Sequence, residues 1–401
     1  MTLISTDFLI IGGGIIGLST ARILKKTYPE AKIIVLEKEA ECGLHASGRN
    51  SGVLHAGFYY TQDSLKAKFT RLGNQLLTSY CDEKKIPLNK CGKLVVANDE
   101  SELPALDELL KRGRANGVIL HKITEKEARE IEPRVRTYQY ALFSPTTSSV
   151  NPREVLQSIT QDAKNEGIII HNNTAYLKRK NKIILTTKNN YQAAYVVNAA
   201  GLYADIIAKD FHFSKNYRIL PFKGLYLYSN EPHFSIKTHI YPVPNLKNPF
   251  LGVHFTITVD GKIKIGPTAI PAFWREQYHR FENFKFYEFI DIFIREMKLF
   301  LFSNFDFKKL AIDEIKKYSK SRLVQLAALQ MNGIKKENFQ TFGKPGMRAQ
   351  LLDVKKGKLE MDFVIEGDQH SMHVLNAVSP AFTSSIPFAQ YVCDQIKKHI
   401  G

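Results

Sequence analysis

Three glycines near the N-terminus have the spacing of a phosphate-binding turn. Gly12, Gly14 and Gly17 follow the apolar run 8–11. They open segment 15–26, which is rich in good helix formers. In such a strand–turn–helix the first glycine permits a tight turn, the second lets the backbone approach a pyrophosphate, and the third lets helix and strand pack closely. The free N–H groups at the helix N-terminus attract phosphate.

An acidic residue ends the next predicted strand. Segment 32–37 contains four consecutive apolar residues and ends at Glu37, 20 residues after Gly17. A carboxylate at this place accepts hydrogen bonds from ribose hydroxyls. A glycine turn without a ligand would not require that acid. The glycines, the acid and the predicted elements together therefore indicate a βαβ unit that binds a dinucleotide.

Two further small-residue segments favour FAD over NAD. The first is 47–52, Ser-Gly-Arg-Asn-Ser-Gly, and the second is 199–201, Ala-Ala-Gly, which follows a buried-strand pattern. The second turn resembles one that passes close to the cofactor in flavoproteins. The resemblance implies that these segments help to bind FAD, and we expect the FAD to be bound without a covalent bond. Beside the glycines and Glu37, the residues expected to contact it are Ser47, Asn50, Ser51, Gly52, Ala200, Gly201 and Ser379.

The chain resembles the L-2-hydroxyglutarate dehydrogenase/oxidase family, within the D-amino-acid-oxidase-like superfamily of FAD enzymes. Two stretches are the most specific, Tyr-Pro-Val-Pro at 241–244 and Leu-Gly-Val-His-Phe-Thr at 251–256. Further colinear matches lie at 47–60, 64–68, 91–94, 200–203, 221–224, 346–350 and 379–385. Two departures are visible: the run 376–380 lacks a glycine-rich turn, and 275–336 aligns with no family motif.

The order of the predicted elements indicates a discontinuous domain organisation. Parallel-sheet patterns occur at the start, near 167–201 and at the end of the chain, whereas 224–265 alternates as antiparallel strands do. We expect an α/β and α+β fold, in which a Rossmann-like FAD-binding domain holds an inserted substrate domain with a mixed antiparallel sheet. The expected segments are 1–85, 145–220 and 335–401 for the first, and 86–144 and 221–334 for the second.

The resemblance implies oxidation of a 2-hydroxy acid to a 2-oxo acid. A hydride passes from the substrate Cα to flavin N5, a base removes the hydroxyl proton, and a quinone or O2 receives the electrons. Histidine suits the base because its pKa lies near neutrality. His254 is favoured as the base and His55 as a positioning group, with a structural histidine as the alternative for each.

A dicarboxylate substrate needs cations. Arg348, in a Gly-Met-Arg sequence, matches the position at which related oxidases bind the α-carboxylate. For the distal carboxylate the candidates are Lys66, Lys68, Arg71 and Lys223, each with a solvated surface charge as the alternative. Hydrogen bonds from Tyr59, Tyr60 and Tyr241 are also expected.

Composition limits the partners and the location. The net charge of +17, from 56 Lys and Arg against 39 Asp and Glu, favours anionic partners or reflects a basic proteome. The four cysteines show no CxxC or metal-ligand spacing, so we expect no metal. The start of the chain lacks a signal-peptide pattern and no apolar stretch reaches membrane-span length, so we expect a cytoplasmic protein.

The Phe-rich segment 281–302 is expected to be helical, and helical character extends to 316. It packs in the core of the second domain or, alternatively, docks on the inner face of a membrane. In the docked arrangement the basic pairs 308–309 and 316–317 meet anionic lipid.

Other functions stay open at the level of sequence. One is an FAD oxidoreductase for another small acid, such as sn-glycerol 3-phosphate or an amino acid. The other is an RNA-associated flavoprotein, suggested by the basic charge. The chain shows no RRM-type or KH-type motif and its lysines are dispersed, so no nucleic-acid partner is expected.

Overall fold

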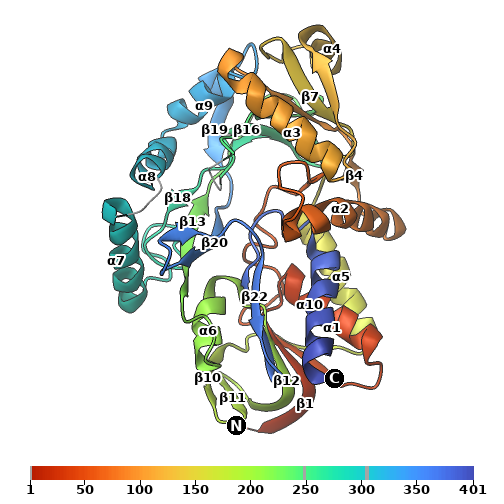
Figure 1. The fold of residues 1–401 in the computed structure, drawn as a ribbon, viewed down its shortest axis with the longest axis vertical. Helices are drawn as coiled ribbons and strands as arrows, with labels where there is room; N and C mark the ends of the chain where they lie inside the picture. The colour runs from red at the N-terminus through yellow and green to blue at the C-terminus, as the bar shows by residue number, and fades with distance from the viewer. Residues whose placement is uncertain (1, 247–249, 303–306) are drawn as a thin grey trace. The chain divides into compact units, whose positions relative to one another are not determined.

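The computed structural model describes residues 2–246, 250–302 and 307–401. These residues form two compact units, each assembled from separate chain segments. Unit 1 comprises Met1–Asn50, Pro152–Pro221 and Met347–Gly401, and unit 2 comprises Ser51–Asn151 and Phe222–Gly346. The expected division kept 51–85, 145–151 and 335–346 with the FAD-binding domain, whereas contacts group all three with unit 2. Figure 1 shows the elements of both units.

Unit 1 is built on a largely parallel sheet. In the described part of the chain the strand order is β10-β11-β12-β1-β2-β9, and β23 pairs with both β12 and β22. The pairings of β1 with β2 and β12, of β2 with β9 and of β12 with β23 are parallel. The elements of the sheet and its helices are β1 (Leu3–Ile11), α1 (Ile15–Thr27), β2 (Ile33–Leu36), α5 (Pro152–Asn165), β9 (Ile169–His171), β10 (Tyr176–Lys180), β11 (Ile183–Thr186), β12 (Asn190–Asn198), α6 (Ala204–Asp210), β22 (Val364–Gly367), β23 (Ser371–Asn376) and α10 (Ser385–Ile400).

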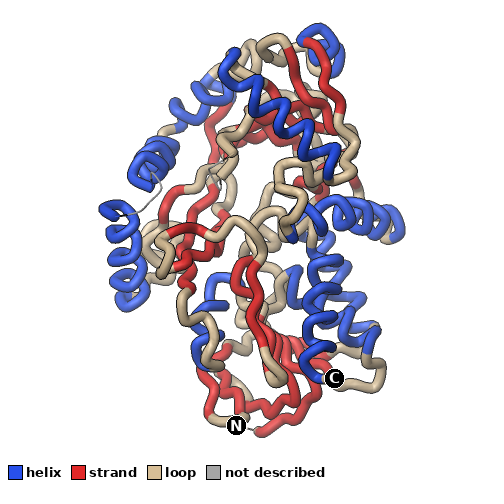
Figure 2. The backbone as a smooth tube through the Cα atoms, in the orientation of Figure 1, coloured by secondary structure: helices blue, strands red, loops and turns tan. Residues whose placement is uncertain are grey.

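Helices cover both faces of this sheet, which explains the continuous apolar sequence of its central strands. On one face Leu9 and Ile11 join a core with Ile207 of α6. On the other face Ile10 lies against Gly17 of α1. Helix α1 contacts α5 and α10, and these three helices lie side by side in Figure 2.

Unit 2 is built on a mainly antiparallel sheet in the order β19-β14-β17-β16-β15-β5-β7-β6, among the residues described. Of the pairings described within it, that of β15 with β5 is parallel and the others are antiparallel. Its elements are β5 (Lys93–Val96), β6 (His121–Thr124), β7 (Tyr140–Ser144), β14 (Leu227–Ser229), β15 (His239–Pro242), β16 (His254–Ile257), β17 (Ile263–Gly266) and β19 (Phe339–Phe342).

Unit 2 also contains helices and short strands outside this sheet. They are β3 (Val53–Leu54), α2 (Leu65–Glu83), β4 (Leu88–Asn89), α3 (Leu103–Ala115), α4 (Glu125–Ile131), β8 (Ser148–Val150), β18 (Ile270–Pro271), α7 (Phe286–Phe302), α8 (Phe307–Ile315) and α9 (Lys320–Ala328). The chain passes between the units in β13 (Tyr217–Gly224) and at the start of β20 (Gly346–Asp353), and β20 pairs with β21 (Lys358–Leu359). None of the described helices is long and apolar enough to span a membrane.

The expected fold class is confirmed, and most predicted elements occur within a few residues of their predicted bounds. The differences concentrate in the last third of the chain. The Phe-rich segment forms α7 and α8, starting only at Phe286, and positions 303–306 lie outside the described residues. Helix α9 and the strands between 339 and 367 were not predicted, because their apolar residues are few and irregularly spaced.

Candidate active site

The first glycine turn is tightly packed within unit 1. Gly12 has a φ of +113°, and a Cβ there would lie 2.5 Å from the carbonyl oxygen of Ala199. A Cβ on Gly17 would lie 2.0 Å from the carbonyl oxygen of Gly12. These two positions therefore admit only glycine, and the Ala199–Ala200 turn lies directly against the glycine turn.

Glu37 is fixed beside this turn. Its side chain is 6% exposed. Oε2 accepts a hydrogen bond from the Gly13 N–H at 3.0 Å, and Oε1 accepts one from the Glu39 N–H at 2.9 Å. Burial raises the pKa of this carboxyl, although the two backbone N–H groups oppose the rise. Each oxygen keeps a further lone pair for a ligand hydroxyl.

The loop after β2 supports the start of α1. Ser47 Oγ accepts a hydrogen bond from the Ile15 N–H at 3.0 Å, and Asn50 Nδ2 donates to the Ser47 carbonyl at 2.7 Å. Gly14, the N-cap, supplies no side chain, and the first turn of α1 contains no acid. The helix end therefore presents backbone N–H groups and no competing carboxylate, as phosphate binding requires.

The remaining expected cofactor residues have less uniform surroundings. The Ala200 N–H donates to Asn198 Oδ1 at 3.2 Å, whereas Gly201 is exposed with open space around a Cβ position. Ser379 is also exposed. Ser51 and Gly52 belong to unit 2.

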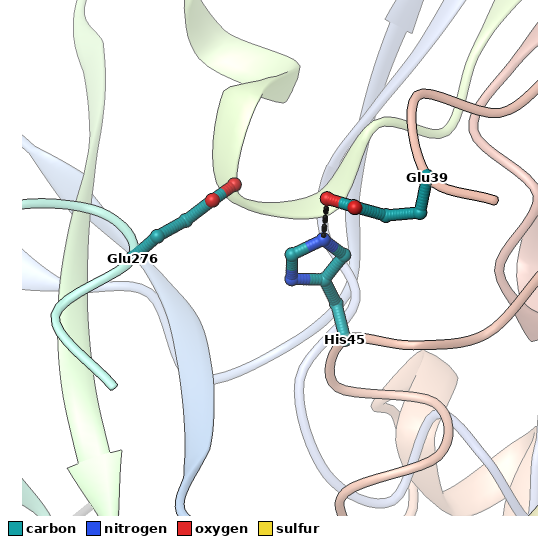
Figure 3. Close-up of side chains that lie close together, drawn as sticks. All are labelled: Glu39, His45 and Glu276. Carbon is teal, nitrogen blue, oxygen red and sulfur yellow. Dashed lines mark hydrogen bonds and ion pairs between the residues drawn. The ribbon is translucent and has the colours of Figure 1, made fainter. Parts of the chain in front are cut away.

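A hydrogen bond within the same loop is shown in Figure 3. His45 Nε2 lies 2.9 Å from Glu39 Oε1. Glu39 also pairs with Lys38 at 3.0 Å, and its two basic partners outweigh partial burial and lower its pKa. The pair ties the loop to the end of β2.

One face of the unit 2 sheet carries buried titratable groups. The pairings of Lys93 with His239 and of Thr256 with Lys264 put these side chains on the same face. The pairing of Ile240 with Phe255 sets Tyr241 opposite His254 on that face too. All six side chains are buried. The opposite face is apolar and belongs to a core that includes Leu94, Leu227, Ile240, Phe255, Ile257, Ile263 and Ile265.

His254 is oriented in a way that suits a base. Nδ1 lies 2.8 Å from the Gly252 carbonyl oxygen. Because a carbonyl oxygen only accepts hydrogen bonds, Nδ1 carries the proton and Nε2 of the neutral ring carries the lone pair. The ring stacks on Tyr241 with 3.7 Å between centroids. Hydrogen bond and stacking together fix the ring plane.

His55 has a different environment. Burial lowers its pKa well below the usual value, and the nearby Lys93 and His239 lower it further. His55 is therefore neutral at physiological pH, as a positioning group or a base must be.

The other candidates for binding the substrate differ in how deeply they are buried. Lys66, over the Tyr60 ring at 5.7 Å, and Lys223 are each 6% exposed, so the surface-charge alternative is wrong for both. Burial also lowers the pKa of Lys223. Lys68 and Arg71 are exposed, as that alternative states. Arg348 is half-buried on β20 of unit 1.

Sequence reasoning missed three buried bases, Lys93, His239 and Lys264. Lys264 Nζ donates to the Ser51 carbonyl at 3.1 Å. It thereby holds the end of segment 47–52, which is expected to help bind FAD. Burial lowers the pKa of Lys264 to about 8 and that of Lys93 to about 7. The available signal was a basic residue within a short apolar strand, as in Lys93-Leu94-Val95-Val96.

Comparison with known proteins identifies the family. Residues 7–395 match the family model described as FAD dependent oxidoreductase. The L-2-hydroxyglutarate dehydrogenase of Escherichia coli K12 is 35% identical, over 98% of this chain and 93% of that protein. The mitochondrial L-2-hydroxyglutarate dehydrogenase of Nematostella vectensis is 36% identical, over 97% and 90%. The chain belongs to the FAD-dependent oxidoreductase family.

A solved structure supports the same fold. L-α-glycerophosphate oxidase from Mycoplasma pneumoniae with FAD bound superposes with a TM-score of 0.76, covering 98% of this chain and 95% of that one. Its sequence identity is 22%, so the likeness concerns the fold alone. The suspected kinship with the L-2-hydroxyglutarate dehydrogenases is confirmed by the two curated relatives.

FAD is the cofactor of this family, and unit 1 fits it. The turn at Gly12 and Gly14 leaves backbone where a pyrophosphate would approach, α1 begins without an acid, and Glu37 is held in place for the ribose. Non-covalent attachment remains a prediction, as do the individual contacts of Ser47, Asn50 and Ser379.

We expect Gly12→Ala to reduce FAD retention at least about tenfold, because the methyl group meets the Ala199 carbonyl at a backbone angle that L-residues avoid. The measurement is the flavin-to-protein absorbance ratio after gel filtration. Gly357→Ala is the matched control, since Gly357 also has a positive φ, +63°, but open space around it. Equal FAD content in both variants would contradict the assignment of the turn.

Proposed function

We propose that this chain oxidises L-2-hydroxyglutarate to 2-oxoglutarate with FAD as the hydride acceptor. Support comes from relatives of that name, 35% and 36% identical over nearly the whole chain. The observation that carries the chemistry is the fixed tautomer of His254, whose Nε2 holds the lone pair that a base needs.

The mechanism assigns each group one task. His254 Nε2 removes the proton of the C2 hydroxyl, so the oxygen lone pair can form the carbonyl as the C–H bond breaks. The chemistry that bound FAD would supply is acceptance of the hydride released from C2. The Gly252 carbonyl and the Tyr241 ring keep the imidazole oriented, and Gly252 stabilises the proton on Nδ1 as the ring becomes cationic. Arg348 is proposed to bind the α-carboxylate and His55 to position substrate or flavin.

We further propose that the enzyme acts on the inner, cytoplasmic face of a membrane and passes its electrons to a quinone, with O2 as the alternative acceptor. Helix α7 supports membrane contact because it buries two glutamates and exposes many large apolar side chains. Its buried stripe contains Glu288, Ile292, Glu296 and Leu299. The apolar residues exposed on the remainder of α7 are Phe286, Tyr287, Ile290, Phe293, Ile294, Met297, Leu301 and Phe302. Core packing does not account for these residues.

The basic residues near α7 differ in what they offer to lipid. Lys308 and Lys309 are exposed. Lys317 is buried and paired with Glu314, and Lys316 lies 3.4 Å from Asp313. The expected contribution of the 316–317 pair to headgroup binding is therefore wrong for Lys317, whose charge is already paired inside the unit.

Anaerobic mixing tests the proposed substrate. L-2-hydroxyglutarate is expected to bleach the visible flavin absorbance and release 2-oxoglutarate, whereas the D-form leaves the spectrum unchanged. sn-Glycerol 3-phosphate, glycine and L-proline serve as alternative substrates. A protein that carries FAD and is bleached by one of these instead would refute the substrate but leave the cofactor assignment intact.

Replacing the proposed base should slow flavin reduction without removing the cofactor. We expect His254→Gln to lower the rate of anaerobic reduction by about 10²- to 10⁴-fold, the usual contribution of a positioned base. His121→Gln, at an exposed histidine on β6, should react at the wild-type rate. A rate within threefold (about 0.7 kcal/mol) of wild type for His254→Gln would exclude His254 as the base.

Liposome flotation tests membrane docking. The intact enzyme is expected to float with vesicles that contain phosphatidylglycerol. The double variant Phe293→Ser/Phe302→Ser should lose about tenfold or more in binding, because two exposed rings no longer enter the interface. Ile119→Ser changes an exposed apolar residue outside α7 and should float as wild type does. An enzyme that stays entirely in solution would overturn the docking proposal.

A further inference from the structure

Two fully buried donors lie beside each other on the polar face of the unit 2 sheet. Lys93 and His239 are paired residues on neighbouring strands, and both side chains are 0% exposed. Among the described residues Lys93 Nζ has no hydrogen-bond partner, and His239 Nε2 has none of normal geometry, although the Ser148 backbone interacts with the His239 ring. Buried donors without a partner are uncommon in folded proteins, because such a donor loses its hydrogen bonds to water and forms no replacement within the protein.

The tautomer of His239 makes its Nε2 atom a donor. The Ile257 N–H donates to His239 Nδ1 at 3.1 Å, so Nδ1 carries the lone pair and Nε2 carries the proton. Burial, with Lys93 and Lys264 nearby, lowers the pKa of His239 to about 3 although the Ser148 backbone opposes the shift, so the ring is neutral. The partner that satisfies Nε2 must therefore be an acceptor.

Aromatic rings surround the Lys93 ammonium. Its Nζ lies 4.6 Å from the ring centroid of Phe58, 4.7 Å from that of Tyr59 and 4.8 Å from that of Tyr241. Ring faces attract a cation, but they do not replace an oxygen acceptor for its N–H groups. No carboxylate of the described residues forms an ion pair with Lys93. An anionic oxygen ligand would supply both the charge and the acceptors.

We propose that Lys93 and His239 form a carboxylate site that binds the second carboxylate of the substrate, the one remote from the oxidised carbon. This inference rests on the proposed function. Lys93 Nζ and the His254 imidazole contact the same Tyr241 ring, so the proposed carboxylate site and the proposed base lie close together within unit 2. In L-2-hydroxyglutarate a short carbon chain separates the hydroxyl from the second carboxylate, so one substrate molecule can present both groups within one site. Lys93 would then determine specificity for dicarboxylates.

The experiment compares two substrates of equal length in the FAD-loaded enzyme. L-2-hydroxyvalerate has a methyl group where L-2-hydroxyglutarate has its second carboxylate. In Lys93→Met we expect kcat/KM for L-2-hydroxyglutarate to fall about 10- to 100-fold, and kcat/KM for L-2-hydroxyvalerate to change less than about threefold. Lys122→Met, at a lysine on β6 that contacts the Tyr140 ring, should retain the wild-type preference.

A binding measurement removes the dependence on turnover. Glutarate and butyrate are titrated while the flavin absorbance is recorded. Lys93→Met and His239→Asn, whose side-chain oxygen can still accept the Ile257 N–H, should each weaken glutarate binding about 10-fold or more and leave butyrate binding unchanged. Flavin content shows that the variants fold.

The outcomes separate the two proposals. If the wild type does not oxidise L-2-hydroxyglutarate, the proposed function fails. If it does, but Lys93→Met keeps the wild-type preference and glutarate affinity, the carboxylate site is wrong. Chloride is titrated in the same way as a simple anion. If it perturbs the flavin spectrum of the wild type but not of Lys93→Met, while glutarate binding stays intact, the site holds a free anion and the inference is overturned.

Discussion

The alternation of side chains in the unit 2 sheet is the constraint on which the candidate active site depends. Leu94, Ile240, Phe255 and Ile265 point to one face and form an apolar core. Their immediate neighbours along each strand must then point to the other face. A register slip of one residue would expose the apolar side chains, so the core holds the strands in place. The same register aligns the bases of the polar face.

The polar face is unusual in the charge of its buried groups. The paired row from β5 to β17 contains Lys93, His239, Thr256 and Lys264, and no acid. Burial disfavours charge on each base, which is why the pKa values of both lysines are lowered toward neutrality. An anion entering such surroundings favours the protonated lysine in return. The face is therefore electrostatically matched to an acidic ligand and not to a cation.

Local features of the fold were predictable because their signals are contiguous. The strand, the glycine turn, the helix and Glu37 all lie within the first 37 residues, and the structure brings Glu37 to the Gly13 N–H. Long-range features were not predictable. Nothing in the sequence shows that Lys93 pairs with His239, because strand register is set by the packed core of the whole sheet.

Burial was equally hard to predict from residue type. Residue type alone predicts that Lys66 and Lys223 are surface charges, because lysine is usually exposed. Both are buried. Lys317 lost its expected role because Glu314, one helical turn earlier, pairs with it. The limits of the two units also depend on contacts between distant segments, so 51–85 could not be assigned from local pattern. Residue types identified the chemistry, whereas tertiary contacts decided which residues of each type were available for it.

Helix α7 and the Lys93 site share one physical feature. Each holds side chains in surroundings that are unfavourable in the isolated chain: aromatic rings in water on α7, and donors without acceptors at Lys93 and His239. A group of this kind lowers the stability of the free protein, and a ligand that satisfies it binds the folded state alone. Such a ligand at 100 times its Kd stabilises the fold by about 2.7 kcal/mol. The proposed lipid surface and the proposed dicarboxylate would thus each stabilise the unit that binds it, by covering rings in one case and by accepting hydrogen bonds in the other.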